Sequence, residues 1–213
     1  MKTIQKVHST PYAAEARTRI LIAAANAFAA NGFRNSTVRD IAINANVNDV
    51  TVYRYFPTKQ RLYWAALDQR LRDSDLPNRI AALLHAAGTP ESLLREITST
   101  VMESFTTDPT LPRLINFTFL ELDEERKLMY QLHFRSQYAL LVKRMADWIE
   151  CGAMRSVDPN KAAMTLVGIL LAECHLNNGA ISHTVNSETA GARAAEYADI
   201  CFAGLDPQNR GKR

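Results

Sequence analysis

The sequence predicts an all-α fold of about nine helices, with three short helices at the N-terminus and a larger helical body after them. Glycine and proline number only eight each in 213 residues, which is few for a β-sandwich with a turn every ~8–12 residues. Apolar side chains recur at spacings of three and four along most of the chain. Thr37, Asn48 and Thr58 precede such stretches as capping residues. Long helices with short connections therefore fit best.

The composition is that of a folded globular protein. Hydrophobic residues make up 47% and charged residues 22%, close to the globular averages. No run of about 18 apolar residues occurs, and no apolar segment follows the N-terminal lysines, so neither a membrane span nor a targeting segment is expected. The three cysteines, Cys151, Cys174 and Cys201, are odd in number and widely spaced. They favour a reducing cytoplasm over a disulfide framework or a cysteine metal site.

Three helices with a tight turn between the second and third are predicted for the N-terminal third. Asn31-Gly32 ends the first helix. Thr37, with Asp40 three residues later, resembles a capping box at the start of the second. Asn46 lies in the turn, where a left-handed backbone is needed and asparagine is the best substitute for glycine. The predicted helices span residues 13–31, 37–44 and 49–55.

The third of these helices contradicts its local propensity. Residues 50–56 are β-branched and aromatic, a composition that favours a strand. A helix is nevertheless predicted, because no similar segment lies nearby to pair with it and the capped helix before it offers a packing surface. Phe56 is expected in the core of this small unit, and Pro57 ends the helix.

The rest of the chain is predicted to form the helical body. Pro90-Glu91 and Asp158-Pro159 open two of its helices, and Gly152 closes the longest. The helix after Asp158 is nearly free of charge, so it needs an apolar cover. The predicted segments are 59–71, 77–87, 90–107, 109–122, 123–150, 159–177 and 188–204. The predicted organisation is a flexible tail at 1–12, a helix-turn-helix unit at 13–57, a body at 58–205 and a flexible tail at 206–213.

Charge is distributed unevenly along the chain. Residues 1–62 carry nine Lys/Arg and three Asp/Glu, a net charge of +6, and the remainder carries −3. A basic three-helix unit with a tight turn has the layout of a helix-turn-helix, whose third helix enters the major groove of double-stranded DNA. For Tyr53 the alternative is packing within the unit, and for Arg39 and Arg54 it is an ordinary solvated charge. The candidate DNA-binding residues are Thr37, Arg39, Asn48, Asp49, Val50, Thr51, Tyr53, Arg54, Tyr55 and Lys59.

These residues, in this order, resemble the TetR family of bacterial transcription regulators. The resemblance rests on Gly32-Phe33, on residues 37–42, on Val47 and on residues 51–59. It is dense over residues 13–67 and looser beyond them. It implies a homodimeric repressor that binds a pseudo-palindromic operator, with a small-molecule effector pocket in the body, two dimerisation helices at the end, and no cofactor.

The resemblance also implies two sites in the body. The effector cavity is expected among aromatic and methionine side chains, for each of which core packing is the alternative: Met102, Phe105, Phe117, Tyr130, His133, Phe134 and Tyr138. The lack of acidic residues amid this set favours an uncharged or weakly polar effector, and the acidic run 121–125 is expected to cover a solvated helix junction. The dimer interface is expected at Ala163, Leu166, Val167, Leu170, Tyr197, Ile200 and Cys201.

Three residues depart from the family pattern. Asn46 stands where glycine is common, Asp49 where lysine or another polar residue is common, and Val50 where a small residue is usual. Asp49 repels phosphate but can accept a hydrogen bond from cytosine N4, and Val50 can contact a thymine methyl. The departures therefore predict a changed operator rather than a loss of DNA binding.

Two other functions remain open. One is a DNA-bound architectural or division-control protein whose body binds a protein partner, which a solidly packed body would favour. The other is a ligand-binding or transport protein whose head no longer binds DNA, which Asp49 motivates. Catalysis is not expected, because G-x-S-x-G, Gly-rich phosphate loop and H-E-x-x-H motifs are missing from the sequence. Glu173, Cys174 and His175 are no metal site, because adjacent helical side chains diverge by about 100°.

Overall fold

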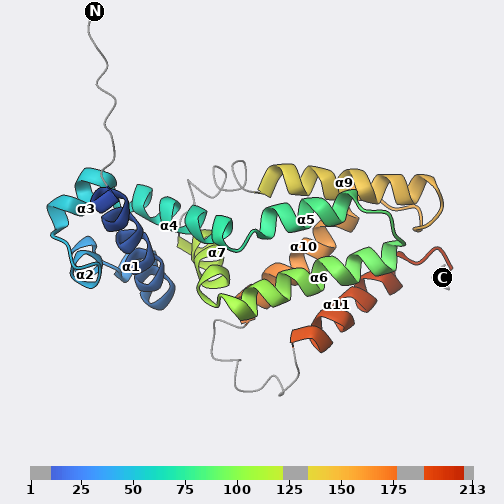
Figure 1. The fold of residues 1–213 in the computed structure, drawn as a ribbon. Coiled ribbons are helices and arrows are strands. Elements are labelled where there is room, and N and C mark those ends of the chain that lie inside the picture. The colour runs from blue at the N-terminus through green and yellow to red at the C-terminus, as the bar shows by residue number, and fades with distance from the viewer. Residues whose placement is uncertain (1–10, 122–133, 177–189, 209–213) are drawn as a thin grey trace, which may run out of the picture. The chain divides into compact units, whose positions relative to one another are not determined.

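The computed structural model describes residues 11–121, 134–176 and 190–208, and every regular element in these ranges is a helix. This confirms the all-α prediction, with ten described helices where about nine were predicted. The chain divides into two compact units between Arg70 and Leu71. The helices are α1 Pro11–Asn35, α2 Val38–Asn44, α3 Asp49–Tyr55, α4 Lys59–Asp73, α5 Leu76–His85, α6 Pro90–Thr107, α7 Thr110–Glu121, α9 Arg135–Glu150, α10 Pro159–Leu176 and α11 Ala190–Leu205 (Figure 1).

The first unit is built on the buried face of α1. Its apolar side chains pack with those of the following helices into one core, which includes Ile20, Ala24, Phe28, Ile41, Val52, Leu62 and Tyr63. The ring of Phe28 lies 5.0 Å from that of Tyr63 and 6.0 Å from that of Phe33. Phe56 is buried, which confirms its predicted place in the core. The aromatic cluster supplies the apolar burial that holds such a small unit together.

The first helix bends at Gly32 and continues beyond it. Gly32 has φ 79° and ψ 171°, outside the helical region, yet helical residues follow as far as Asn35. The predicted end at Asn31-Gly32 is therefore a kink within α1. The Ser36 hydroxyl bonds to the carbonyls of Gly32 at 2.7 Å and of Ala27 at 3.0 Å, so a side chain satisfies carbonyls that the kink frees.

The predicted capping residues occupy the predicted positions. The Thr37 hydroxyl accepts the Asp40 amide at 3.1 Å, and the Asn48 side chain accepts the Thr51 amide at 2.7 Å. The Thr58 hydroxyl accepts the Arg61 amide at 3.1 Å. These bonds start α2, α3 and α4 and confirm three predicted helix starts. The segment 50–56 forms a helix despite its β propensity, because burial of its apolar face against the unit outweighs a preference of about 1 kcal/mol.

The turn from α2 to α3 is a Schellman motif. Asn46 has φ 53°, which confirms the predicted left-handed backbone. The Asn46 amide donates to the Ile43 carbonyl, and the Val47 amide donates to the Ala42 carbonyl, both over 3.0 Å. The turn thus ends α2 and starts the chain toward α3 within two residues.

Substitutions at Asn46 should separate the cost of its backbone from the role of its amide. Asn46→Gly is expected to leave the free energy of unfolding unchanged or raise it by about 0.5 kcal/mol, because glycine adopts positive φ freely. Asn46→Ala is expected to lower it by about 1 kcal/mol, because a Cβ is strained there. Urea denaturation measures both, with Asn44→Ala as the control at a right-handed position. An equal loss in both Asn46 variants would assign the stabilisation to the amide instead.

The second unit packs α11 along α6 and sets α10 against α9 and α7 (Figure 1). Its core joins buried side chains of α6, α9, α10 and α11, among them Leu93, Leu94, Met145, Trp148, Ala163, Leu166 and Cys201. The bounds of α6, α7, α10 and α11 lie within two residues of the predicted ones. Only residues 134–150 of the predicted helix 123–150 belong to the described part. None of the described helices is both long enough and apolar enough to cross a membrane.

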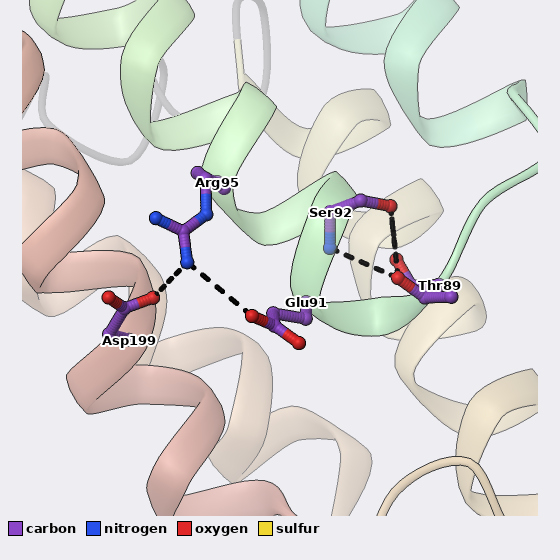
Figure 2. Close-up of polar contacts among 5 residues, drawn as sticks. All are labelled: Thr89, Glu91, Ser92, Arg95 and Asp199. Carbon is purple, nitrogen blue, oxygen red and sulfur yellow. Dashed lines mark hydrogen bonds and ion pairs between the residues drawn. The ribbon is translucent and has the colours of Figure 1, made fainter.

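Polar side chains connect the start of α6 to α11 (Figure 2). The Thr89 hydroxyl accepts the Ser92 amide at 3.2 Å and so caps α6. The Arg95 guanidinium lies between two carboxylates, 3.4 Å from that of Glu91 and 2.5 Å from that of Asp199 on α11. All three ionic side chains are 41% exposed or more, so each pair contributes less than about 1 kcal/mol. Apolar packing, rather than these ion pairs, therefore provides most of the stabilisation between α6 and α11.

Candidate nucleic-acid interface

One face of α3 anchors the helix and the other is open to solvent. Val52 is fully buried, whereas the side chains of Val50 and Tyr53 are 72% and 49% exposed. Asp49 and Arg54 are exposed as well. A valine this exposed gains little from burial in the unit, so its methyl groups are available to a ligand. The exposed face therefore offers apolar, aromatic, acidic and basic groups side by side.

Three candidate residues form hydrogen bonds at the start of α3. The Asn48 oxygen accepts both the amide of Thr51 and its hydroxyl, the latter at 2.8 Å. The Asp49 carboxylate accepts the Val50 amide at 2.9 Å. A carboxylate at a helix N-terminus is stabilised by the helix dipole. Asn48, Asp49 and Thr51 thus stabilise the start of α3 within the protein itself.

Basic candidates differ in how firmly the protein holds them. Arg54 is exposed, and its guanidinium lies 5.4 Å from the ring centre of the half-buried Tyr55. Arg39 on α2 is exposed, and so is Thr37, whose hydroxyl also donates to Asp40 at 2.6 Å. Arg39 and Arg54 can therefore reach a ligand without giving up a bond to the core.

Lys59 has a role inside the unit that the sequence did not reveal. Its ammonium donates to the Arg34 carbonyl at 3.2 Å and lies 4.6 Å from the centre of the Phe33 ring. Both residues follow the kink at Gly32. Lys59 thus connects the start of α4 to the end of α1. An ammonium has three donors, so this role is compatible with a phosphate contact.

Two arginines of α1 were not among the candidate residues. Arg17 places its guanidinium 5.5 Å from the Phe56 ring centre. The Arg19 Nε donates to the Ala45 carbonyl at 3.2 Å. In the sequence these residues appear only as part of the positive charge of the N-terminal third. No local motif marks these two contacts, because they join residues 26 or more positions apart along the chain.

The candidate effector residues fall into different environments. Met102 is fully buried, while Phe105, Phe117, Phe134 and Tyr138 are half-buried. The Tyr138 hydroxyl donates to the Asn160 carbonyl at 3.3 Å, so this side chain connects α9 to the start of α10. Tyr130, His133 and residues 122–125 of the acidic run lie outside the described residues.

Two clefts of the described part lie elsewhere. A cleft of about 620 Å³ in the second unit runs along α6, and a cleft of about 270 Å³ in the first unit lies beside α1. The larger is lined by Leu83, Arg95, Glu96, Ser99, Thr100, Glu103, Thr106, Thr107 and Gly191, the smaller by Arg19, Ile22, Ala23, Asn26 and Asn44. No candidate effector residue lines either cleft.

Of the candidate dimer-interface residues on α10 and α11, some are buried within the chain and others lie at its surface. Ala163, Leu166 and Cys201 are buried in the core of their own chain, so they have no surface to offer a second copy. At these three positions the apolar periodicity marks an intramolecular core, because both kinds of burial produce the same pattern. Val167, Leu170 and Tyr197 are half-buried. Ile200 is 58% exposed. Met164, which was not a candidate, is 65% exposed.

A buried carboxylate connects the last two helices. Glu173 on α10 is only 4% exposed, and Arg193 Nε lies 3.2 Å from one of its oxygens. The Tyr197 hydroxyl donates to its other oxygen at 2.7 Å. Burial, together with the bond to Glu173, raises the pKa of Tyr197 from 10.0 to about 12. The side chains of Cys174 and His175 lie outside the described part, in which no cluster of His, Cys, Asp and Glu could hold a metal ion.

The pKa of Tyr197 predicts how stability changes in alkali. Because the folded-state pKa of about 12 lies above the ordinary 10.0, the phenol contributes its full stabilisation below pH 10 and loses it as pH rises toward 12. The difference in free energy of unfolding between wild type and Tyr197→Phe should therefore shrink across this window. Denaturation at pH 8, 10 and about 11.5 measures it. A difference that grows with pH would contradict the assigned bond.

Comparison with known proteins identifies relatives of the first unit and of the whole fold. Residues 20–66 match the model of the family described as bacterial regulatory proteins, tetR family. The HTH-type transcriptional repressor KstR of Mycolicibacterium smegmatis is 30% identical over 130 residues, which cover 57% of this chain and 63% of that relative. The chain thus spans less than two thirds of the length of this curated relative.

Solved structures extend the likeness to both units. FadR from Bacillus subtilis, crystallised with stearoyl-CoA, has a TM-score of 0.73 at 18% identity, with 88% of this chain and 98% of that chain covered. The ketosteroid transcriptional regulator KstR2 of Mycobacterium tuberculosis has a TM-score of 0.67 at 21% identity, with 89% and 94% covered. At such identities the likeness establishes the fold alone.

The family match and the geometry concern the same residues. Residues 20–66 run from the core of α1 through the Schellman turn and α3 into α4. The proteins found by these comparisons are regulators, not enzymes. Residues 20–66 therefore carry the sequence pattern of the bacterial regulatory proteins of the tetR family, and the described part of the chain shares its fold with solved regulators.

Proposed function

We propose that the protein is a homodimeric, one-component transcriptional repressor that binds a pseudo-palindromic operator and is released by a small-molecule effector. The observation that carries this proposal is the solvent-facing side of α3, where Val50, Tyr53 and Arg54 extend from a helix that is capped at Asn48 and anchored by Val52. The repressor named among the relatives supports the direction of regulation.

The recognition helix has the chemistry to read base edges and phosphates. Val50 would contact a thymine methyl, and Arg54 would donate to guanine or to a phosphate. Asp49 would accept from a cytosine amino group with its carboxylate, which the N-terminus of α3 already stabilises. Thr37 and Lys59 lie at the starts of α2 and α4, where amides and side chains together suit a phosphate.

Effector release would act through the spacing of two recognition helices. Two half-sites lie about 34–36 Å apart, or a multiple of this distance, so a changed spacing weakens binding without altering any base contact. Helix α4 continues across the division between the units and would transmit the change. The effector would be uncharged or weakly polar, since Met102 and the half-buried Phe105 and Phe117 are apolar. FadR, which was crystallised with stearoyl-CoA, has the same fold.

Selection of bound fragments from the source genome tests the proposal. A pseudo-palindromic consensus, with affinity that falls steeply as salt rises, is expected for a dimeric regulator. Weak binding without sequence preference would overturn the proposal and favour the architectural alternative. No binding at any salt concentration would favour a ligand-binding protein whose head no longer contacts DNA.

Arg54 provides a quantitative prediction on the selected fragment. If its guanidinium meets a phosphate, Arg54→Ala should flatten the slope of log affinity against log salt by about one unit. Fluorescence anisotropy between about 50 and 200 mM salt measures the slope. Lys143→Ala is the control, because Lys143 is exposed on α9 in the second unit. An unchanged slope with unchanged affinity would remove Arg54 from the interface.

A further inference from the structure

The carbonyl of Ala45 receives a hydrogen bond from outside its own helix. Ala45 is the last residue before the left-handed Asn46, and it is buried. Its carbonyl accepts the Nε of Arg19, on α1, over 3.2 Å. The same guanidinium pairs through Nη1 with Glu15 at 3.2 Å, one turn earlier on α1. The pair with Glu15 is exposed and uses a different nitrogen from the one that bonds the Ala45 carbonyl.

This bond supplies a partner that the turn itself lacks. The final carbonyls of a helix have no partner within the helix. In the Schellman motif, the amides of Asn46 and Val47 satisfy Ile43 and Ala42. The carbonyl of Ala45 is the last of the series, and it belongs to the peptide unit that enters Asn46. This peptide unit is therefore held at both ends, by Ile43 through the Asn46 amide and by Arg19 through the Ala45 carbonyl.

The orientation of this peptide unit determines where α3 begins. Asn46 holds φ 53° without the freedom of glycine, and Asn48 caps α3 only two residues later. A rotation at Ala45 would move Asn48 and the exposed side chains of α3 together. Arg19 also lines the 270 Å³ cleft between α1 and α2, with Asn26 and Asn44. The bond is therefore partly buried at one edge of this cleft.

We propose that Arg19 is a positioning residue for the recognition helix, which it orients through the Ala45 carbonyl without contacting DNA. The proposal rests on the proposed function, since it concerns how α3 is presented to an operator. It explains a bond that spans the unit from α1 to the turn, and it adds a residue of α1 to those that determine specificity.

The test compares Arg19→Met, which keeps the aliphatic stem, and Arg19→Lys, which keeps a donor. Affinity is measured on a fragment selected from the source genome and on a random duplex of equal length, below the unfolding temperature of each variant. Arg19→Met should lower affinity for the selected fragment by about tenfold, the effect of one lost charge-assisted hydrogen bond, and leave affinity for the random duplex unchanged. Arg19→Lys should restore part of the ratio between the two affinities. Glu15→Gln is the control, since it removes only the outer, exposed pair.

Hydrogen exchange provides a readout without DNA. In Arg19→Met, amides of residues 45–49 should exchange faster, while those of the α1 core keep their protection. Three results would overturn the proposal: an unchanged affinity ratio, equal losses on both duplexes with a flatter salt slope, which would indicate a phosphate contact, or faster exchange throughout the unit. If the wild type binds no selected fragment, the proposed function fails, whereas the exchange result still tests Arg19 alone.

Discussion

Glu173→Ala is expected to lower the free energy of unfolding by about 3 kcal/mol, the largest loss foreseen for a single polar residue of this chain. Glu173 is 4% exposed, and the side chain of its partner Arg193 is only 18% exposed. Removing the carboxylate takes an ionic partner from the largely buried Arg193 guanidinium and the acceptor from the Tyr197 hydroxyl. Equilibrium denaturation in urea measures the loss.

Matched variants separate the parts of this network. Tyr197→Phe removes one hydrogen bond and should cost about 1 kcal/mol. The double variant Glu173→Met with Arg193→Met should recover most of the stability, because a buried ion pair replaced by apolar side chains of similar volume is often neutral. A double variant as unstable as Glu173→Ala would show that the charges themselves hold α10 against α11. No loss in Glu173→Ala would contradict the buried pair.

The network was invisible in the sequence for a physical reason. A glutamate in an alanine- and leucine-rich helix gives no sign of its burial, because the compensating donors lie 20 and 24 residues later on another helix. The same holds for the bonds that Arg19 Nε and the Lys59 ammonium donate to backbone carbonyls 26 and 25 residues away. Backbone acceptors have no sequence identity, so no motif can encode them.

Local chemistry, by contrast, was readable. Thr37, Asn48 and Thr58 act on amides three residues ahead, so each cap lies within a window of four letters. The positive φ of Asn46 follows from the same local logic. The helix at 49–55 does not follow from local propensity alone, because packing on the preceding helix overrides its β propensity.

Surface and core were harder to distinguish at the end of the chain. Leu166 and Met164 both belong to a charge-poor helix, yet the first is buried and the second is 65% exposed. Gly168 and Ala172 follow Met164 at intervals of four and are exposed too, so one face of α10 offers an apolar side chain and small residues to a partner. On α11, Ile200 is exposed. These positions, rather than the buried Ala163, Leu166 and Cys201, are the ones to change when the proposed dimer is tested.

The double variant Met164→Glu with Ile200→Glu is expected to be monomeric and to bind the selected operator about a hundredfold more weakly. The physical reason is that each head then binds its half-site alone and loses the effective concentration that the linked second head provides. Both side chains are more than half exposed in the single chain, so glutamate meets water there in the monomer and is buried only in a dimer.

Light scattering on a sizing column and operator affinity measure the two effects, and circular dichroism verifies the helical fold. Ala139→Glu, on the exposed side of α9, is the control and should remain dimeric. Leu166→Glu is unsuitable, because a charge in the core of the second unit would unfold it and remove dimers for that reason alone. Dimers that persist in the double variant would place the interface away from α10 and α11, whereas monomers with full operator affinity would show that a single head suffices for recognition.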